Sequence, residues 1–232
     1  MEKIRSAILP IMLFLTGLSV LLYPTVSNYR STQVQSTVIA SYEAALNAME
    51  RADSAPYFTA ADRYNAQLRQ IGTPLVNCGQ IPGYDALLNI DGTGMIGYVS
   101  IDKINAVLPI YHGTAPGILN VAAGHIEGTS LPVGGNGTHA VLSAHCGLPR
   151  ARLFTDLDQL QEGDRFSLTV LDRILTYEVD RISVVKPDQT AALAIEDGKD
   201  YCTLMTCTPY GINTHRLLVR GVRTKASSPQ GL

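Results

Sequence analysis

Three side chains at the ends of short apolar segments could together carry out chemistry at a thiol. Cys207 closes the segment TLMTC, Arg216 opens RLLVRG nine residues later, and His145 closes HAVLSAH. A cysteine nucleophile needs a thiolate and a proton donor for the leaving amine, and a histidine can be that donor. A guanidinium beside the sulfur favours the thiolate or stabilises a developing oxyanion. These residue types therefore indicate covalent acyl transfer.

Strand ends could bring the three side chains together. If TLMTC and RLLVRG are neighbouring antiparallel strands joined by residues 208–215, Cys207 and Arg216 face each other across the mouth of the loop. His145 directly precedes the turn CGLP, so it also lies at a strand end. Each residue alone has an ordinary explanation as a buried thiol, a solvated cation or a surface imidazole. The combination of the three indicates a catalytic site.

The region from residue 94 onward predicts a mainly β domain. Its segments rich in Val, Ile, Leu or Tyr are MIGYVSI, AVLPIYH, HAVLSAH, RFSLTVL, ILTYEV, ISVV, CTLMTC and RLLVRGV. Short strands at this spacing, with turn residues and little helix between them, are typical of a barrel or a sandwich. The segment ARLFTDLDQL, after Pro149, predicts one short amphipathic helix.

The amino terminus carries a candidate membrane segment. Residues 8–23 form an apolar run preceded by Lys3 and Arg5, and extension to Val26 brings it near the length of a spanning helix. Positive charge before the run predicts a cytoplasmic amino terminus and an extracellular remainder. We favour an uncleaved signal anchor. A cleaved signal peptide and a buried core helix are the alternatives.

The stretch between the anchor and the strands predicts two amphipathic helices and a loop. Apolar residues recur at helical spacing over residues 34–70, and Pro56 disfavours helix at Ala55, which predicts a break there. The segment GTPLVNCGQIPG is rich in glycine and proline and predicts a loop. The expected divisions are an anchor (1–30), a helical region (31–71), a lid-like loop and linker (72–93), the β domain (94–224) and a polar tail (225–232).

The composition narrows the class of protein. The chain has 232 residues and a net charge of −2, with 46% apolar and 16% charged residues, which suits one globular domain with an appendage. The near-neutral charge argues against nucleic acid as a partner. Four cysteines are too few for a disulfide scaffold, and the five histidines form neither HExxH nor zinc spacing with cysteine. The sequence therefore predicts no metal and no cofactor.

The motifs resemble those of class C sortases, the pilin-polymerising members of a family of membrane-anchored cysteine transpeptidases in Gram-positive bacteria. The signature TLxTC followed by an arginine reads here as TLMTC and Arg216. Four further segments are also similar to sequences of this class: LPIYHGT, GHIEGTSLPVGG, LFTDLDQLQEGD and TCTPYGINTHRLLVRG. The resemblance runs from about Met95 to Arg223, over half of the chain.

This resemblance implies a closed eight-stranded sortase-type β-barrel with the site at one rim. Cys207 would attack the Thr–Gly bond of an LPxTG-like sorting signal on a pilin. His145 would act as general acid and base, and Arg216 would bind the substrate backbone and the oxyanion. A lysine amine of another pilin would resolve the acyl-enzyme outside the plasma membrane. Calcium, used by some other sortase classes, has no acidic cluster here to support it.

One departure from the class concerns the loop before the barrel. Class C sortases usually carry Asp-Pro and an aromatic residue there, in a lid over the cysteine, whereas residues 72–84 lack this motif and contain Cys78. We hypothesise that Cys78 lies in or near the lid and forms a redox-dependent disulfide with Cys207 or Cys146. The alternative is an unpaired loop cysteine with no role. Cys202, five residues before Cys207, is predicted to lie in the core.

Two other functions fit part of the sequence. One is a sortase-fold hydrolase that releases the acyl group to water, and the other is a non-catalytic, membrane-tethered β domain that binds a wall or pilus component. Caspase-like enzymes also place histidine before cysteine, here by 62 residues, but their signature around the cysteine is absent. Papain-like enzymes have the opposite order. Cys207→Ala would separate an enzyme from a binding module.

Overall fold

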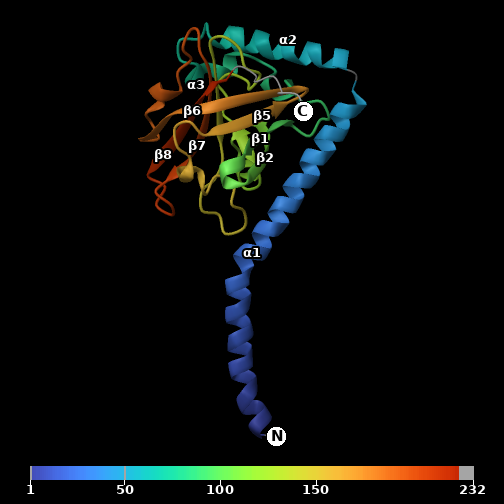
Figure 1. Ribbon diagram of the computed structural model, residues 1–232, viewed down its shortest axis with the longest axis vertical. Coiled ribbons are helices and arrows are strands. Elements are labelled where there is room, and N and C mark those ends of the chain that lie inside the picture. Colours follow the sequence, from blue (N-terminus) through green and yellow to red (C-terminus); the bar gives the residue numbers. More distant parts are fainter. Residues whose placement is uncertain (1, 50, 225–232) are drawn as a thin grey trace, which may run out of the picture.

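A long helix and a β-barrel make up the computed structural model, which describes residues 2–49 and 51–224 (Figure 1). Helix α1 (Glu2–Ala48) leaves the barrel on one side, and α2 (Arg51–Leu68) crosses one of its ends. Within the described residues, α1 is the one helix long and apolar enough to cross a membrane. Its side chains from Leu9 to Val26 are exposed, so the predicted anchor is a lone helix and not a buried core helix.

The predicted helix boundaries are partly wrong. The anchor and the first amphipathic helix form one continuous helix, α1, and the expected break at Ala55 does not occur because α2 runs through Pro56. A proline inside a helix removes one hydrogen bond and costs about 3 kcal/mol. Burial of Phe58, Tyr64 and Leu68 of α2 in the main core offsets this cost.

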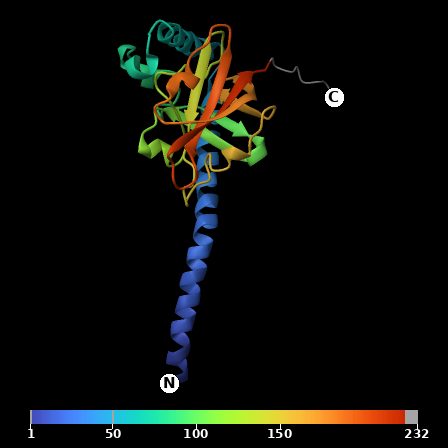
Figure 2. The same ribbon diagram turned by 90° about the vertical axis from the view of Figure 1, so that its left-hand side faces the viewer.

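Eight strands close into a barrel in the order β1-β2-β3-β4-β7-β8-β6-β5 (Figure 2). The strands are β1 (Met95–Ile101), β2 (Ala106–His112), β3 (Ala123–His125), β4 (Thr138–Ser143), β5 (Arg165–Val170), β6 (Arg173–Val185), β7 (Asp200–Thr208) and β8 (His215–Arg223). The β2–β3 and β4–β7 pairs are parallel, and the other pairs are antiparallel. The predicted closed eight-stranded barrel is confirmed.

Three local predictions differ from the structure. Strand β3 is missing from the predicted set, and ILTYEV and ISVV are parts of the single strand β6, whose pairing with β8 shifts between Val179 and Arg181. The helix predicted in ARLFTDLDQL is wrong, since only Leu157–Gln159 forms a short 3₁₀ turn. Leu153 has a φ of 44°, which a right-handed helix cannot accommodate.

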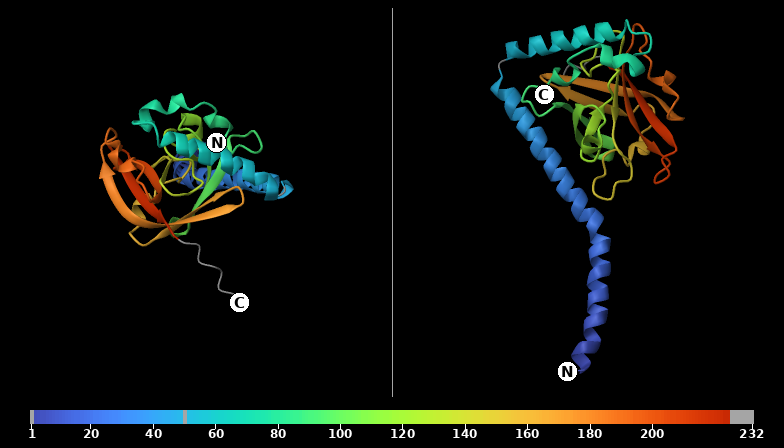
Figure 3. Two further views of the ribbon diagram at one scale, coloured as in Figure 1. Left: turned by 90° about the horizontal axis from the view of Figure 1, so that it is seen from above. Right: turned by 180° about the vertical axis from the view of Figure 1, so that it is seen from behind.

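The two ends of the barrel have different coverings. At the end where β4 and β7 begin, α2 lies across the opening (Figure 3), and the Asn65 side chain accepts a hydrogen bond from Leu131 N–H at 2.7 Å. We call this the α2 end. At the opposite end β4 and β7 finish and β8 begins, and we call this the Cys207 end.

Polar contacts fix α1 to the side of the barrel. The fully buried Tyr42 hydroxyl accepts a hydrogen bond from Leu171 N–H at 2.9 Å, and the Gln35 amide donates to the Val121 carbonyl at 2.8 Å. A buried hydrogen bond of this kind is costly to leave unmade. The second half of α1 is therefore part of the folded domain.

Candidate active site

Cys207 and Arg216 lie opposite each other at the Cys207 end of the barrel. Strands β7 and β8 pair antiparallel with Cys207 and Arg216 as Cα partners, and residues 209–214 form the loop between them. The spacing of nine residues therefore gave the correct pairing. Both residues are half-buried, as expected for groups at the mouth of a site.

The pairing of β4 with β7 brings His145 to the same end. Strand β4 ends at Ser143, whose partner is Met205, and the next residue continues the pattern because Ala144 N–H donates to the Met205 carbonyl at 3.2 Å. Extending this parallel register by two residues places His145 beside Cys207. All three predicted catalytic residues thus gather at one rim.

Thr206 locks this register. Its hydroxyl is buried and donates a 2.8 Å hydrogen bond to the Ala144 carbonyl, directly before His145. The backbone that carries the imidazole is therefore tied to the backbone that carries the thiol. Positioning of this kind contributes to catalysis because small displacements of a reacting group are costly.

We expect Thr206→Val to lower both stability and turnover. Valine keeps the shape of threonine but leaves the buried Ala144 carbonyl without its partner, at a cost of about 1–3 kcal/mol. Turnover of a peptide substrate should fall roughly tenfold through misplacement of His145. Urea unfolding and steady-state kinetics measure the two effects. Thr206→Ser keeps the hydroxyl and is the control; equal behaviour of the two variants would contradict the prediction.

The cysteines near Cys207 have distinct environments. Cys202 is fully buried in the main core, as predicted, and burial raises the pKa of its thiol far above the usual value. Burial also raises the pKa of Cys146, with further contributions from Asp158 and from the neighbouring Cys207. The thiolate is the nucleophilic form of cysteine, so a raised pKa makes Cys146 a weaker nucleophile.

The Arg216 guanidinium is held in place by its own loop. Its Nη1 donates to the Asn213 carbonyl at 3.3 Å and to the His215 carbonyl at 3.1 Å. A fixed guanidinium with further free N–H groups is suited to bind a carbonyl oxygen that gains negative charge. The side chain is thus preorganised at the rim.

The lid-like loop packs on the outer face of the barrel towards the α2 end (Figure 1). It forms the short helix α3 (Pro74–Asn77) and a 3₁₀ turn from Cys78 to Gln80. Leu75 packs against the apolar cluster of Val141, Leu193 and Leu218. The segment lacks the Asp-Pro-aromatic motif, and it lies nearer to α2 than to the rim that carries Cys207.

Gly128 allows this close approach. A Cβ atom at this position would lie 2.7 Å from the Pro74 carbonyl oxygen and 2.8 Å from the Leu75 Cα, and the residue has a φ of 86°. Only glycine adopts this conformation without strain in so little space. Gly128 therefore allows the segment to pack closely against the connection between β3 and β4.

Cys78 has a different neighbour from the one hypothesised. Burial and the nearby Glu127 carboxylate raise the pKa of its thiol, whereas Cys146 is the thiol that interacts with Cys207. All four cysteines lie within the described residues and all are free. The redox-dependent disulfide of Cys78 stays a prediction.

Two cavities in the structure were not predicted from the sequence. One of about 230 Å³ lies between the lid-like loop and the β6–β7 connection, and Leu75, Gly128 and Leu193 are among its lining residues. Leu193 belongs to the apolar cluster with Val141 and Leu218, and Leu75 packs against this cluster. The sequence signal for the cavity was the apolar TAALAI segment within the connection before β7.

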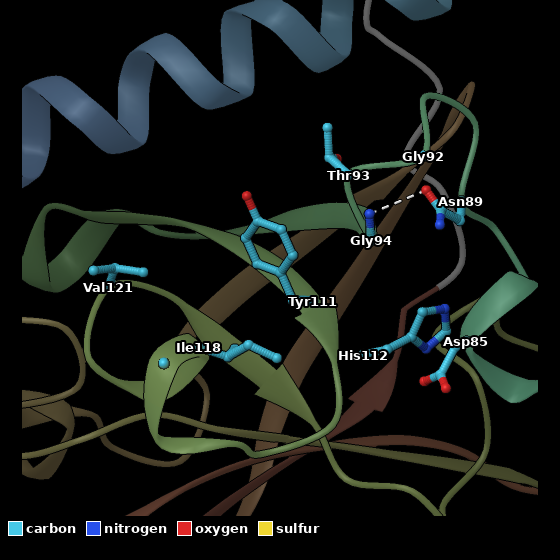
Figure 4. Close-up of a pocket in the computed structure, with 10 residues that line it drawn as sticks. Asp85, Asn89, Gly92, Thr93, Gly94, Tyr111, His112, Ile118 and Val121 are labelled. Carbon is cyan, nitrogen blue, oxygen red and sulfur yellow. Dashed lines mark hydrogen bonds between the residues drawn. The ribbon is translucent and has the colours of Figure 1, made fainter.

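The other cavity, of about 480 Å³, lies beside β2 and the connection that follows it (Figure 4). Tyr111 and His112 of β2 line it together with Asp85 and Asn89. Since His112 lies at the far end of β2 from the rim that carries Cys207, this cavity is separate from the candidate active site.

Buried histidines outside the rim support the fold. His139 connects β4 to the β6–β7 connection and to β7, because its ring nitrogens bond the Ala194 carbonyl at 2.9 Å and the Thr203 hydroxyl at 2.7 Å. His125 is fully buried, and burial lowers its pKa to about 4. Both imidazoles are therefore structural, whereas His145 and His215 lie at the Cys207 end, where His215 pairs with Thr208.

This barrel and rim define a class of protein, and comparison with known proteins identifies it. Residues 99–224, more than half of the chain, match the sortase domain family, so the chain belongs to the sortases. Sortase D of Bacillus subtilis is 32% identical over 130 residues, which cover 55% of this chain and 63% of that protein. The alignment therefore spans less than two thirds of that relative.

Solved structures of sortase C resemble the chain more completely. The Streptococcus pneumoniae sortase C is 42% identical with a TM-score of 0.75, and the match covers 83% of this chain and 99% of that one. A Clostridium perfringens sortase C, solved with the C-terminal cell wall sorting motif, is 44% identical with a TM-score of 0.72, covering 82% and 99%. The predicted resemblance to class C sortases is confirmed.

Proposed function

We propose that this chain is a membrane-anchored sortase transpeptidase that cleaves an LPxTG-like sorting signal and transfers it to an amine. The observation that carries the proposal is the convergence of Cys207, Arg216 and His145 at one rim through the registers of β7 with β8 and β4 with β7. Nucleophile, oxyanion donor and proton carrier are the three groups that acyl transfer requires.

The reaction proceeds in two halves. The Cys207 thiolate attacks the carbonyl of the Thr–Gly bond, and the oxyanion that forms accepts hydrogen bonds from Arg216. His145 donates a proton to the glycine nitrogen as the C–N bond breaks, which leaves a thioester on Cys207. The incoming amine attacks this thioester and His145 takes its proton. A new amide bond forms as the C–S bond breaks, and the Cys207 thiolate and protonated His145 are restored.

The proposed substrates are pilin subunits, with a pilin lysine as the acceptor amine. Two similar solved proteins support this, since the Streptococcus pneumoniae structure is described in terms of pilin substrate specificity and the Clostridium perfringens one with its cell wall sorting motif. Both alignments span nearly the whole of those chains. Such an enzyme would build an isopeptide-linked fibre.

The membrane segment would hold the enzyme at the cell surface. The apolar half of α1 is the candidate anchor, and its basic amino-terminal flank in the sequence favours a catalytic domain outside the plasma membrane. A single anchor of this kind keeps the enzyme with membrane-bound substrates.

The decisive experiment incubates the full chain with an LPxTG peptide and an amine acceptor, and identifies products by mass spectrometry. An amine-ligated peptide together with an acyl adduct on Cys207 is the expected result. Cleavage to the free acid alone would favour the sortase-fold hydrolase. Peptide binding without any product would favour the non-catalytic wall- or pilus-binding domain.

A further inference from the structure

The end of the apolar segment is bonded to the loop that follows His145. Ser27 of α1 donates to the Arg150 carbonyl at 3.3 Å, and the Asn28 side chain accepts a hydrogen bond from Arg152 N–H at 2.9 Å. These contacts join α1 to the Cys207 end of the barrel. The position of the Cys207 end along the axis of α1 is therefore fixed, at the level of Ser27 and Asn28.

The level of Ser27 along α1 coincides with the expected edge of a bilayer. The exposed apolar stretch from Leu9 to Val26 rises about 27 Å as a helix, close to the roughly 30 Å of a hydrocarbon core. The next residue, Ser27, already contacts the rim. Tyr23 and Tyr29 are exposed on either side of this level, and tyrosine is enriched at membrane interfaces.

The rim also carries exposed apolar side chains. Tyr210 and Ile212, in the loop between β7 and β8, are 66% and 68% exposed, and Val184 near the end of β6 is 59% exposed. Figures 1 and 2 show this loop pointing along α1 towards the amino-terminal half of the helix. Large exposed apolar groups gathered on one surface mark an interaction site.

We propose that the Cys207 end of the barrel rests on the lipid bilayer, with Tyr210 and Ile212 in the headgroup layer. This inference rests on the proposed anchoring and adds the orientation of the site. The continuity of α1 from the apolar segment to the rim argues for lipid as the occupant of this surface. The mouth at Cys207 then opens next to the membrane and receives peptide segments that lie close to it.

The absence of tryptophan from the chain makes a direct test simple. Ile212→Trp places a single indole on the proposed contact, and Ile174→Trp places one at the α2 end, where Ile174 is 67% exposed. The full chain is reconstituted in phosphatidylcholine–phosphatidylglycerol vesicles with lipids brominated near the headgroup. We expect Ile212→Trp to lose roughly half of its emission and to shift to the blue, because side chains at an interface sink about 5–10 Å into it. The Ile174→Trp variant should emit as in water.

The outcomes distinguish a failure of the bilayer contact from a failure of the anchoring or the chemistry proposed above. Flotation with the vesicles tests the anchor, and transfer of a soluble peptide tests the chemistry. A chain that floats but shows no quenching at Ile212→Trp overturns the bilayer contact and leaves the anchor standing. A chain that does not float overturns both. Tyr210→Trp serves as a second reporter if Ile212→Trp fails to fold, and equal quenching at Ile174→Trp also overturns the proposal.

Discussion

Cys207→Ala is expected to abolish the covalent product while peptide binding persists. Removing the nucleophile eliminates the thioester, so the rate of transfer should fall by about 10⁴-fold or more. The thiol is half-buried on the outward face of β7 and is not part of the main core, so the barrel should stay folded. Mass spectrometry of the acyl adduct and fluorescence anisotropy of a labelled peptide measure the two effects.

The neighbouring thiol provides the matched control. Cys146 lies close to Cys207 and is also half-buried, and burial raises the pKa of its thiol, which disfavours its thiolate. Cys146→Ala should therefore keep the acyl adduct and most of the transfer rate. An adduct that persists in Cys207→Ala and maps to Cys146 would refute the assignment of the nucleophile.

The second large effect is expected at Arg216. Arg216→Ala removes the guanidinium that we propose binds the developing oxyanion, and loss of such a donor typically costs about 10²–10³-fold in turnover. Arg216→Lys keeps the charge but loses the planar fork, so it should recover only part of the rate. Steady-state kinetics with the peptide give kcat and kcat/KM for each variant.

An exposed cation elsewhere on the barrel controls for charge. Arg181 of β6 is exposed, so Arg181→Ala changes the net charge by the same amount without touching the rim. We expect its kcat to stay within about twofold of the unchanged chain. Similar losses in Arg181→Ala and Arg216→Ala would show that net charge, not oxyanion binding, is responsible.

The features that the sequence predicted best depend on local spacing. Cys207 and Arg216 belong to one antiparallel pair, so a short loop between two apolar segments was enough to bring them together. His145 is paired with β7 from 62 residues away. No local spacing encodes such a parallel pairing. The turn after His145 placed it at a strand end, and the motif resemblance indicated that this strand end belongs to the same rim as Cys207.

The features that the sequence missed depend on tertiary packing. Strand β3 has three residues, too few for any alternating pattern. Pro56 lies inside a helix because the barrel holds the α2 side chains, and residues 153–160 bury their leucines through turns instead of a helix. The lid-like loop packs against the connection between β3 and β4 because Gly128 leaves room for its backbone.

The parallel pairing of β4 with β7 also determines when the candidate site can assemble. His145 is made well before Cys207, and Arg216 arrives with β8, the last strand of the barrel. Pairing segments so distant in sequence requires closure of a long loop, which makes such contacts slow to form. A chain that has not yet gained β7 and β8 therefore has no assembled site. Closure of the barrel and assembly of the candidate site are one event.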